Sequence, residues 1–201
     1  MGEDAKDRED FTFEQLQDLR NAEIQRSPEV IWLMHLMLDT GLRVKECCGL
    51  RVLDIVLDDQ QPYLKLQKNP FRRLKTKSSQ RFVPLVGVAL KAVMDALDSA
   101  ETEWLFPNYI DVEQAETKNA PASAAVNKRI KVLLGEDAPT CHSFRHTMQT
   151  RLRQVECPRD IRDELGGWSR TISDQYGSTA DIDAKAKYLK ASIDIRHRKI
   201  V

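Results

Sequence analysis

Residues 52–85 read VLDIVLDDQQPYLKLQKNPFRRLKTKSSQRFVPL, and they interrupt an otherwise helical sequence pattern. Three short stretches of this segment, 52–57, 63–67 and 81–85, are rich in β-branched residues or alternate apolar with polar residues, as strands do. Turn-forming residues separate them: Asp58-Asp59-Gln60, Asn69-Pro70 and Lys77-Ser78-Ser79. The segment therefore predicts a small antiparallel sheet of three strands.

The sequence on either side of this segment has helical periodicity. Thr12 and Gln15 form a capping box at the start of a helix that extends to about Arg26. After the predicted sheet, one apolar helical face is formed by Val88, Leu90, Val93, Met94 and Leu97. The other helices are expected at about 29–39, 42–50, 123–134, 142–155, 158–165 and 181–193, with a polar loop at 107–122.

These elements predict a fold that is mainly α with a small antiparallel three-stranded sheet. Residues 1–10 are charged throughout and are expected to form a disordered leader or linker. Residues 11–201 are expected to form one domain.

The composition limits the classes of protein to which the chain can belong. No apolar run approaches the roughly 18 residues that span a bilayer, and the charged start is unlike a signal peptide, so we expect a cytoplasmic protein without a membrane partner. The four cysteines, Cys47, Cys48, Cys141 and Cys157, have the spacing of neither a zinc site nor a disulfide framework, and we expect buried, reduced thiols. The sequence contains no Walker loop and no cluster of metal ligands.

The charge of the chain is unevenly distributed, although 31 Lys and Arg residues balance 31 Asp and Glu residues. Residues 65–81 contain seven basic residues and no acidic one, and residues 185–199 contain six basic residues against Asp194 alone. A neutral chain of this kind can present a positive face to a nucleic-acid backbone. We predict that DNA contacts are made by Lys68, Arg72, Arg73, Lys77 and Arg81.

Two motifs place an arginine three residues from another ionisable side chain, a glutamate in one motif and a histidine in the other. In TGLRVKE (40–46), Arg43 follows a glycine turn and can meet Glu46 on one helical face, although such a pair is also typical of an exposed surface. In HSFRHT (142–147), the same spacing brings His142 beside Arg145, which suits capture of a phosphate oxygen together with proton transfer. A pair of this type alone also arises by chance. His146 points roughly 100° away around the helix and is interpreted as a structural histidine.

Two further segments have weaker signals. LKTKSSQR (74–81) is a basic turn between two predicted strands, which either holds a lysine over a phosphate backbone or is a solvated hairpin tip. Leu165-Gly166-Gly167-Trp168 is followed eight residues later by Tyr176, an arrangement that also fits a helix end with two partly buried aromatic residues.

In their order and spacing, these motifs together resemble the tyrosine recombinase (phage integrase) family, through the strings TGLRVKE, LKTKSSQRFVPL, HSFRHT and LGGWS…DQYG. The resemblance extends from about Phe11 to beyond Tyr188 and implies the catalytic-domain fold of that family. It implies a site-specific DNA recombinase or integrase, in which a tyrosine attacks a phosphodiester, forms a 3′-phosphotyrosyl link and frees a 5′-hydroxyl. The link conserves energy, so the resemblance implies neither ATP, metal nor any other cofactor.

The resemblance also assigns roles to matching positions. Arg43 and Arg145 clamp the non-bridging phosphate oxygens, and Glu46 orients Arg43. Without a metal, these cations must meet the charge of the transition state. Two arginines suit this role because they stay charged and can each bond two oxygens.

Proton transfer is assigned to the remaining matching positions. Lys75 is the general acid toward the leaving 5′-oxygen, with Lys77 as its rival because the length of the hairpin varies. His142 assists proton transfer from Tyr176, the nucleophile. Tyr188, in a predicted helix, is expected to pack or to mediate contacts instead.

One position departs from the family pattern. The residue nine positions before the tyrosine is often histidine, and here it is Gly167, which has no side-chain donor. Some family members use tryptophan, and Trp168 can supply an indole N–H with a shift of one residue. Trp168 is therefore the expected sixth catalytic residue.

Family members normally have a further N-terminal DNA-binding domain, which the resemblance implies is absent from this chain. The partners it implies are double-stranded DNA with attachment sites, a homo-tetramer on that DNA, and accessory DNA-bending or excision factors. The string WSRTISDQYG favours a phage or mobile-element integrase. The alternatives are a type IB topoisomerase, which shares the tyrosine, arginines and lysine, and a non-catalytic DNA-binding relative. A simple helix-turn-helix regulator leaves the arginine, histidine and tyrosine set unexplained.

Overall fold

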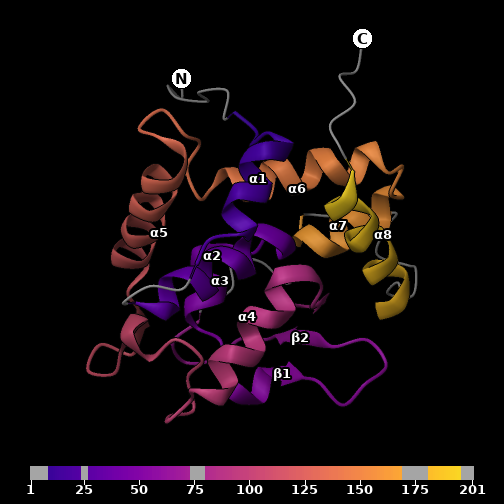
Figure 1. Ribbon diagram of the computed structural model, residues 1–201. Helices are drawn as coiled ribbons and strands as arrows, with labels where there is room; N and C mark the ends of the chain where they lie inside the picture. The colour runs from indigo at the N-terminus through magenta and orange to yellow at the C-terminus, as the bar shows by residue number, and fades with distance from the viewer. Residues whose placement is uncertain (1–8, 24–26, 73–79, 169–180, 196–201) are drawn as a thin grey trace, which may run out of the picture.

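The computed structural model describes residues 9–23, 27–72, 80–168 and 181–195. The helices are α1 (Phe13–Arg20), α2 (Pro28–Thr40), α3 (Val44–Cys48), α4 (Gly87–Asp98), α5 (Asn119–Leu134), α6 (Ser143–Gln154), α7 (Arg159–Gly166) and α8 (Ile182–Asp194). The strands are β1 (Ile55–Val56), β2 (Tyr63–Leu66), β3 (Arg81–Pro84), β4 (Ile110–Asp111) and β5 (Glu116–Thr117), with 3-10 turns η1 (Val52–Asp54) and η3 (Pro107–Tyr109). The predicted mainly α fold with a small sheet is confirmed (Figure 1).

The predicted three-stranded sheet is present, in the order β1-β2-β3 with both pairs antiparallel. Leu64 lies opposite Ile55 on one side and Val83 on the other, and Leu64, Leu66 and Val83 are buried. β1 is shorter than predicted because residues 52–54 form the turn η1, in which the Asp54 carboxylate accepts the Arg51 backbone N–H at 3.1 Å.

The segment 107–122 is not the plain loop that its polarity predicts. It contains η3, a two-stranded antiparallel ribbon of β4 and β5, and the start of α5 at Asn119. Ile110 and Thr117 face each other in the ribbon and are both buried, while Ala115 has a positive φ of 50° in the turn. With only two residues a strand, this ribbon has too little periodicity to be recognised in a sequence.

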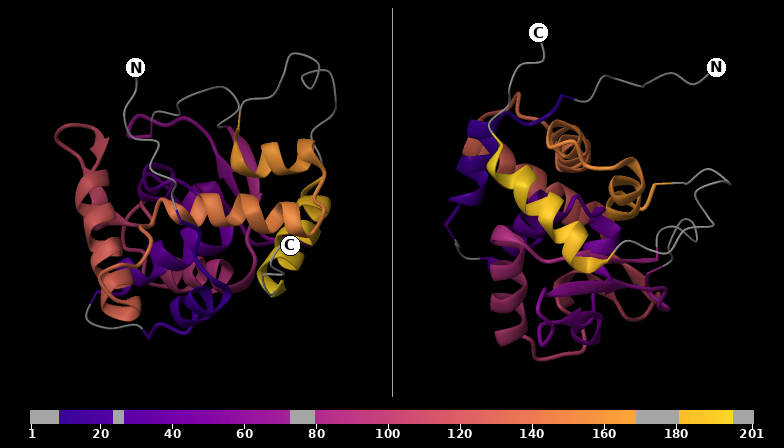
Figure 2. Two further views of the ribbon diagram at one scale, coloured as in Figure 1. Left: turned by 90° about the horizontal axis from the view of Figure 1, so that it is seen from above. Right: turned by 90° about the vertical axis from the view of Figure 1, so that its right-hand side faces the viewer.

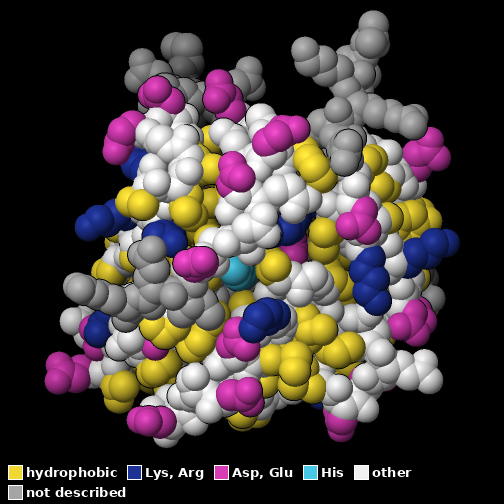
Figure 3. All heavy atoms as spheres, viewed as in Figure 1, with side chains coloured by type: hydrophobic (Ala, Val, Ile, Leu, Met, Phe, Trp, Pro, Cys, Tyr) yellow, Lys and Arg dark blue, Asp and Glu magenta, His cyan; other side chains and the backbone are white. Residues whose placement is uncertain are grey.

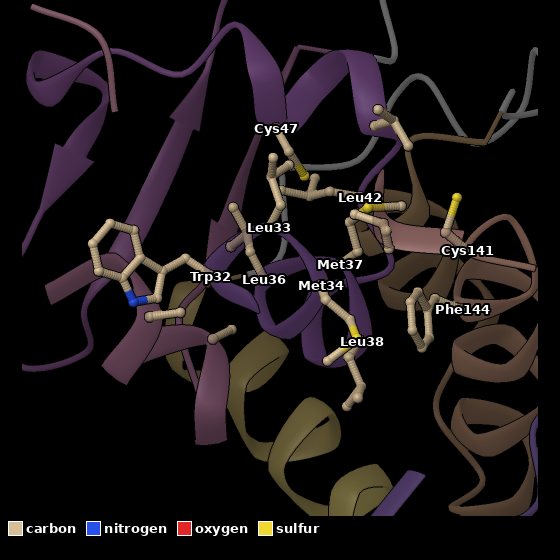
Figure 4. Packing of buried hydrophobic residues seen from close by; sticks show 14 of the residues in the cluster. Trp32, Leu33, Met34, Leu36, Met37, Leu38, Leu42, Cys47, Cys141 and Phe144 are labelled. Atoms are coloured by element: carbon tan, nitrogen blue, oxygen red, sulfur yellow. The ribbon is translucent and has the colours of Figure 1, made fainter. Parts of the chain in front are cut away.

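The main core surrounds α2, nearly all of whose apolar residues are buried. Figure 4 shows Met34 and Met37 of α2 in one cluster with Phe144 at the start of α6, and the ring of Phe144 also stacks on Phe11 at 4.6 Å. The predicted apolar face of α4 is confirmed except at Met94, which is 48% exposed: Val93 is buried, and the residues that pack against the core beside it are Val88, Leu90 and Leu97. Small residues allow α4 to approach α2 closely, and its buried residues are Ala89, Ala92, Val93 and Ala96.

A second apolar cluster joins α6, α7 and α8 to the end of β3 (Figure 2). It contains Val86, Met148, Leu152, Cys157, Ile161, Leu165, Ala186 and Leu189. At its edge, Lys185 of α8 forms a buried ion pair with Glu164 of α7 at 2.7 Å. The C-terminal helix is therefore part of the packed domain. α8 packs beside the end of α7.

The N-terminal residues depart from the predicted leader at their last position. Residues 1–8 lie outside the described residues, but the Asp10 carboxylate accepts hydrogen bonds from the Thr147 and Thr150 hydroxyls of α6 at 3.2 and 2.7 Å. Asp10 thus belongs to the folded domain. α1 ends at Arg20 rather than near residue 26, because Asn21 caps it.

The predicted capping box of α1 is confirmed and gives a simple stability test. The Thr12 hydroxyl accepts the Gln15 N–H at 3.2 Å, and the Gln15 side chain accepts the Thr12 N–H at 2.9 Å. We expect Thr12→Ala to lower the free energy of unfolding by about 1 kcal/mol, measured by urea denaturation. Thr12→Ser, which keeps the hydroxyl, should retain the wild-type value, and equal stability of the Ala variant would contradict this assignment.

The four cysteines are free and buried, as expected. The part of the chain that the structure describes has no helix that is both long and apolar enough to cross a membrane.

Candidate active site

The first predicted arginine lies where α2 gives way to α3. Gly41 ends α2 in a left-handed conformation with φ of 62°, which favours glycine, and a Cβ there would collide with Met148. Arg43 then caps α3, and its Nη1 donates to Glu46 Oε1 at 2.9 Å while its backbone N–H donates to Oε2, also at 2.9 Å. The predicted pairing of Arg43 with Glu46 is confirmed.

This pair is not the solvated ion pair of an ordinary helix surface. The Glu46 side chain is 4% exposed, whereas the Arg43 side chain is 37% exposed. Burial acts to raise the pKa of Glu46, but the charge and hydrogen bonds of Arg81, followed by those of Arg43, hold that pKa at about 2. Glu46 is thus a fixed, ionised support, and Arg43 keeps a surface for a ligand.

The second predicted arginine, Arg145 on the first turns of α6, is held by two backbone carbonyls. Its Nη1 donates to the Gly41 carbonyl at 3.2 Å and its Nη2 donates to the Gly166 carbonyl at the end of α7. The guanidinium also stacks on the Trp168 ring, 4.7 Å from the centroid. Two segments that lie far apart in the sequence, one at Gly41 and one at 166–168, therefore position this one group.

The electrostatics of the site favour an anion. Arg43, Arg81 and Arg145 supply three positive charges, and Glu46 supplies one negative charge within the group. Burial, and after it the positive charge of Arg43, lowers the pKa of Arg145 to about 9. Arg145 remains protonated at neutral pH, and a phosphate placed between the two arginines would relieve their repulsion.

A cavity of about 640 Å3 opens beside these arginines, between α3, α6 and the start of α5. Arg43, His142 and Arg145 all line it. His142 is the exposed N-cap residue of α6, so the predicted HxxR pair does face one space. His146 also lines the cavity and is exposed, because the first turns of α6 face solvent on this side; its interpretation as a structural histidine stays a prediction.

The departure at Gly167 has a local explanation. Gly167 ends α7 in a left-handed conformation with φ of 58°, which favours glycine over residues with a side chain. A Cβ on the preceding Gly166 would collide with the Trp168 ring, so the two glycines make room for the indole beside Arg145. This geometry supports Trp168 as a site residue, while its role as a hydrogen-bond donor stays a prediction.

Several predicted site residues lie outside the described residues: Arg73, Lys75, Lys77 and Tyr176. The choice between the two lysines therefore remains a prediction, as does the nucleophile. Tyr188 is described, and it packs in α8 against the cluster around Leu152, as predicted for a structural residue.

Two of the five predicted DNA contacts are corrected by the structure. Arg72 is fully buried, pairs with Asp54 at 3.0 Å and donates to the Gly49 and Gln67 carbonyls. Its side chain fixes the turn after β2 and cannot reach DNA in this fold. Arg81 is likewise buried, and it pairs with Glu46. Lys68 is exposed, as a DNA contact requires.

The basic segment therefore divides into buried supports and surface charges. A run of basic residues in a sequence does not show which of them are paired inside the protein. On the face seen in Figure 3, acidic and basic side chains are interspersed rather than gathered by sign. Among the residues described, no group of His, Cys, Asp or Glu side chains has the arrangement of a metal site.

The comparison with known families identifies this combination of elements. The sequence profile of the Phage integrase family matches residues 9–176, which include both arginines, His142, the lysine segment and Tyr176. The chain belongs to the phage integrase family. It is accordingly a tyrosine recombinase, and its described residues form the catalytic-domain fold. A search of curated protein sequences gives no match.

Solved integrase structures share the fold. The integrase of transposon Tn1549, solved with a circular intermediate DNA, is 17% identical with a TM-score of 0.61, and the match covers 94% of this chain and 67% of the other. The same integrase with transposon right end DNA gives 17% identity, a TM-score of 0.60 and coverage of 94% and 68%. The catalytic core of lambda integrase is 20% identical with a TM-score of 0.54, and the match covers 82% of this chain and 94% of that core.

Proposed function

We propose that this integrase-family domain cuts and rejoins DNA by transesterification, with Tyr176 as the nucleophile and without metal or ATP. The observation that carries the proposal is the convergence of Arg43 and Arg145 on one cavity together with His142. Each guanidinium has its orientation fixed by the protein, through Glu46 for Arg43 and through two carbonyls for Arg145. Preorganised cations of this kind stabilise a phosphorane-like transition state at little cost of reorganisation.

The chemistry then follows in balanced steps. The Tyr176 oxygen attacks the phosphorus, its proton passes toward His142, and a phosphotyrosyl bond forms as the bond to the 5′-oxygen breaks. Lys75, or Lys77 in its place, gives a proton to the leaving 5′-oxygen. Attack by a 5′-hydroxyl of another strand reverses these steps and releases the tyrosine, so the number of phosphodiester bonds is unchanged.

The partners follow from the same proposal. The substrate is double-stranded DNA at attachment sites, and strand exchange between two duplexes requires a homo-tetramer on the DNA. The Tn1549 structures, in which a transposon integrase holds DNA, support a mobile-element integrase. Action in the cytoplasm and accessory DNA-bending or excision factors are further parts of the proposal. Lys68 and the basic residues Arg73 and Lys77 are proposed to meet the phosphate backbone.

A covalent trapping experiment tests this function. The protein is incubated with a nicked suicide duplex carrying its attachment site, and adducts that resist denaturant are separated by electrophoresis. We expect a protein–DNA adduct at the 3′-phosphate and, with a second duplex, joined products. A shift in native gels without any adduct would identify a DNA-binding relative instead. If the protein forms adducts and relaxes supercoiled DNA but never joins a second duplex, its activity is that of a topoisomerase.

A further inference from the structure

Arg81, the first residue of β3, lies buried between the supports of the two active-site arginines. Its Nη1 and Nη2 donate to Glu46 Oε1 and Oε2 at 3.0 and 3.1 Å, and its Nε donates to the Leu165 carbonyl at 3.0 Å. Only 3% of its side chain is exposed, so it touches neither DNA nor the cavity directly. One guanidinium therefore joins β3 to α3 and to the end of α7.

The two residues that accept hydrogen bonds from Arg81 are each connected to one of the active-site arginines: Glu46 to Arg43, and Leu165, through the adjacent Gly166, to Arg145. Glu46 Oε1 accepts from Arg81 and also from Arg43 Nη1 at 2.9 Å, so the carboxylate that orients Arg43 is itself held from the opposite side. Leu165 immediately precedes Gly166, whose carbonyl accepts from Arg145. The position of Arg81 thus fixes the position of α3 relative to the end of α7, which are the two places from which Arg43 and Arg145 are aimed.

We infer that Arg81 is a positioning residue for DNA cleavage, which sets the distance and orientation between the Arg43 and Arg145 clamps. This inference rests on the proposed function. A planar guanidinium makes the three bonds in fixed directions, which a lysine ammonium cannot reproduce. A displacement of about 1 Å in a catalytic group can slow a reaction about 10²-fold, so loss of this brace should reduce the rate of cleavage rather than the binding of DNA.

The same segment supplies a matched control for a purely structural role. Arg72 is also fully buried and paired with a carboxylate, Asp54, at 3.0 Å. Its other side-chain hydrogen bonds go to the Gly49 and Gln67 carbonyls, and none goes to Arg43, to Arg145 or to a group that accepts a hydrogen bond from either of them. Removing either arginine takes one of two cationic partners from a buried carboxylate, because Glu46 keeps Arg43 and Asp54 keeps Arg51, and each loss destabilises the fold. Only removal of Arg81 takes hydrogen bonds from Glu46 and from the Leu165 carbonyl.

The pH dependence provides a second distinguishing measurement. The charged groups that face Glu46 are all positive, and they are Arg43 at the start of α3, Arg81 of β3, Arg145 of α6 and Arg72 after β2. The thiol of Cys47 in α3, which also faces Glu46, is neutral. Arg81 is the largest of the influences that hold the pKa of Glu46 at about 2 against burial. Without Arg81 that pKa rises, so Glu46 becomes protonated and releases Arg43 as the pH falls through the new value.

The experiment compares Arg81→Met, Arg81→Lys and Arg72→Met with the wild type. Single-turnover adduct formation is measured on saturating nicked suicide DNA between pH 5 and 8, corrected for the folded fraction from thermal unfolding. We expect Arg81→Met to cleave about 10²-fold more slowly and with a new loss toward acid pH. Its Kd for DNA should stay within about threefold of the wild-type value, because a slower chemical step need not change binding. Arg81→Lys should lie between these limits, and Arg72→Met should keep the wild-type rate per folded molecule.

The outcomes separate this inference from the proposed function. If Arg81→Met and Arg72→Met have the same rate and pH profile per folded molecule, Arg81 is only structural and the inference is overturned. If Arg81→Met does not fold, the same comparison with Arg81→Lys decides. If the wild type itself forms no adduct, the proposed function fails and this inference fails with it.

Discussion

Tyr176→Phe is expected to abolish the covalent DNA adduct completely while leaving binding of the DNA unchanged. The substitution removes the one oxygen that the proposed reaction joins to phosphorus, and it keeps the aromatic ring. Because a phosphotyrosyl bond cannot form through phenylalanine, the loss is absolute rather than graded. The measurement is electrophoresis of denatured products from the nicked suicide duplex, beside a native gel that reports binding.

Tyr188→Phe is the matched control for the nucleophile. Tyr188 lies in α8 and packs against the cluster beneath α6 and α7, with Lys187 Nζ 5.8 Å from its ring centroid. Its substitution should change the rate of adduct formation less than about threefold, since the ring that packs there is kept. If Tyr188→Phe removed the adduct and Tyr176→Phe kept it, the assignment of the nucleophile would be reversed.

Arg145→Lys should slow adduct formation by about 10²- to 10³-fold, the scale seen when a preorganised donor to a transition-state oxygen is removed. A lysine keeps the charge, but it has one nitrogen where Arg145 uses Nη1 for the Gly41 carbonyl and Nη2 for the Gly166 carbonyl. It also has no flat face to lie on the Trp168 ring. Charge alone therefore does not replace the group.

The control for this change is Arg153→Lys on the same helix. Arg153 is exposed near the end of α6, so its substitution should leave both the rate and the stability near the wild-type values. The rates are single-turnover rates of adduct formation at saturating DNA. An Arg145→Lys protein that cleaved within about fivefold of the wild type would show that a point charge is sufficient.

The local elements of the fold were predictable because their signals are local. The capping box of Thr12 and Gln15, the apolar run of α2 and the alternation around Leu64 each describe an interaction between residues close in sequence or on one face. The predictions were wrong where contacts between residues distant in the sequence determine which side chains are buried. Met94 of α4 looks like a core residue, but α2 is approached through the alanines of the neighbouring face.

The same division applies to the site. Arg43 and Glu46, and likewise His142 and Arg145, are three residues apart in the sequence, and the structure brings Arg43, His142 and Arg145 to one cavity. Five of the seven basic residues between 65 and 81 are predicted from the sequence to contact DNA, because a sequence does not show which cations pair with carboxylates inside the fold. Burial and the partners Asp54 and Glu46 make Arg72 and Arg81 internal supports instead.

The sequence by itself thus determined the family and most of the helical and strand pattern, and it supplied the candidates for the reactive side chains, since these depend on residue type and short spacing. Only the tertiary structure decided how the clamps are held. The Gly41 and Gly166 carbonyls lie 125 residues apart in the chain, and both accept from Arg145. Backbone carbonyls are present at every residue, so no sequence pattern marks the two that orient Arg145; packing of α2, α6 and α7 selects them.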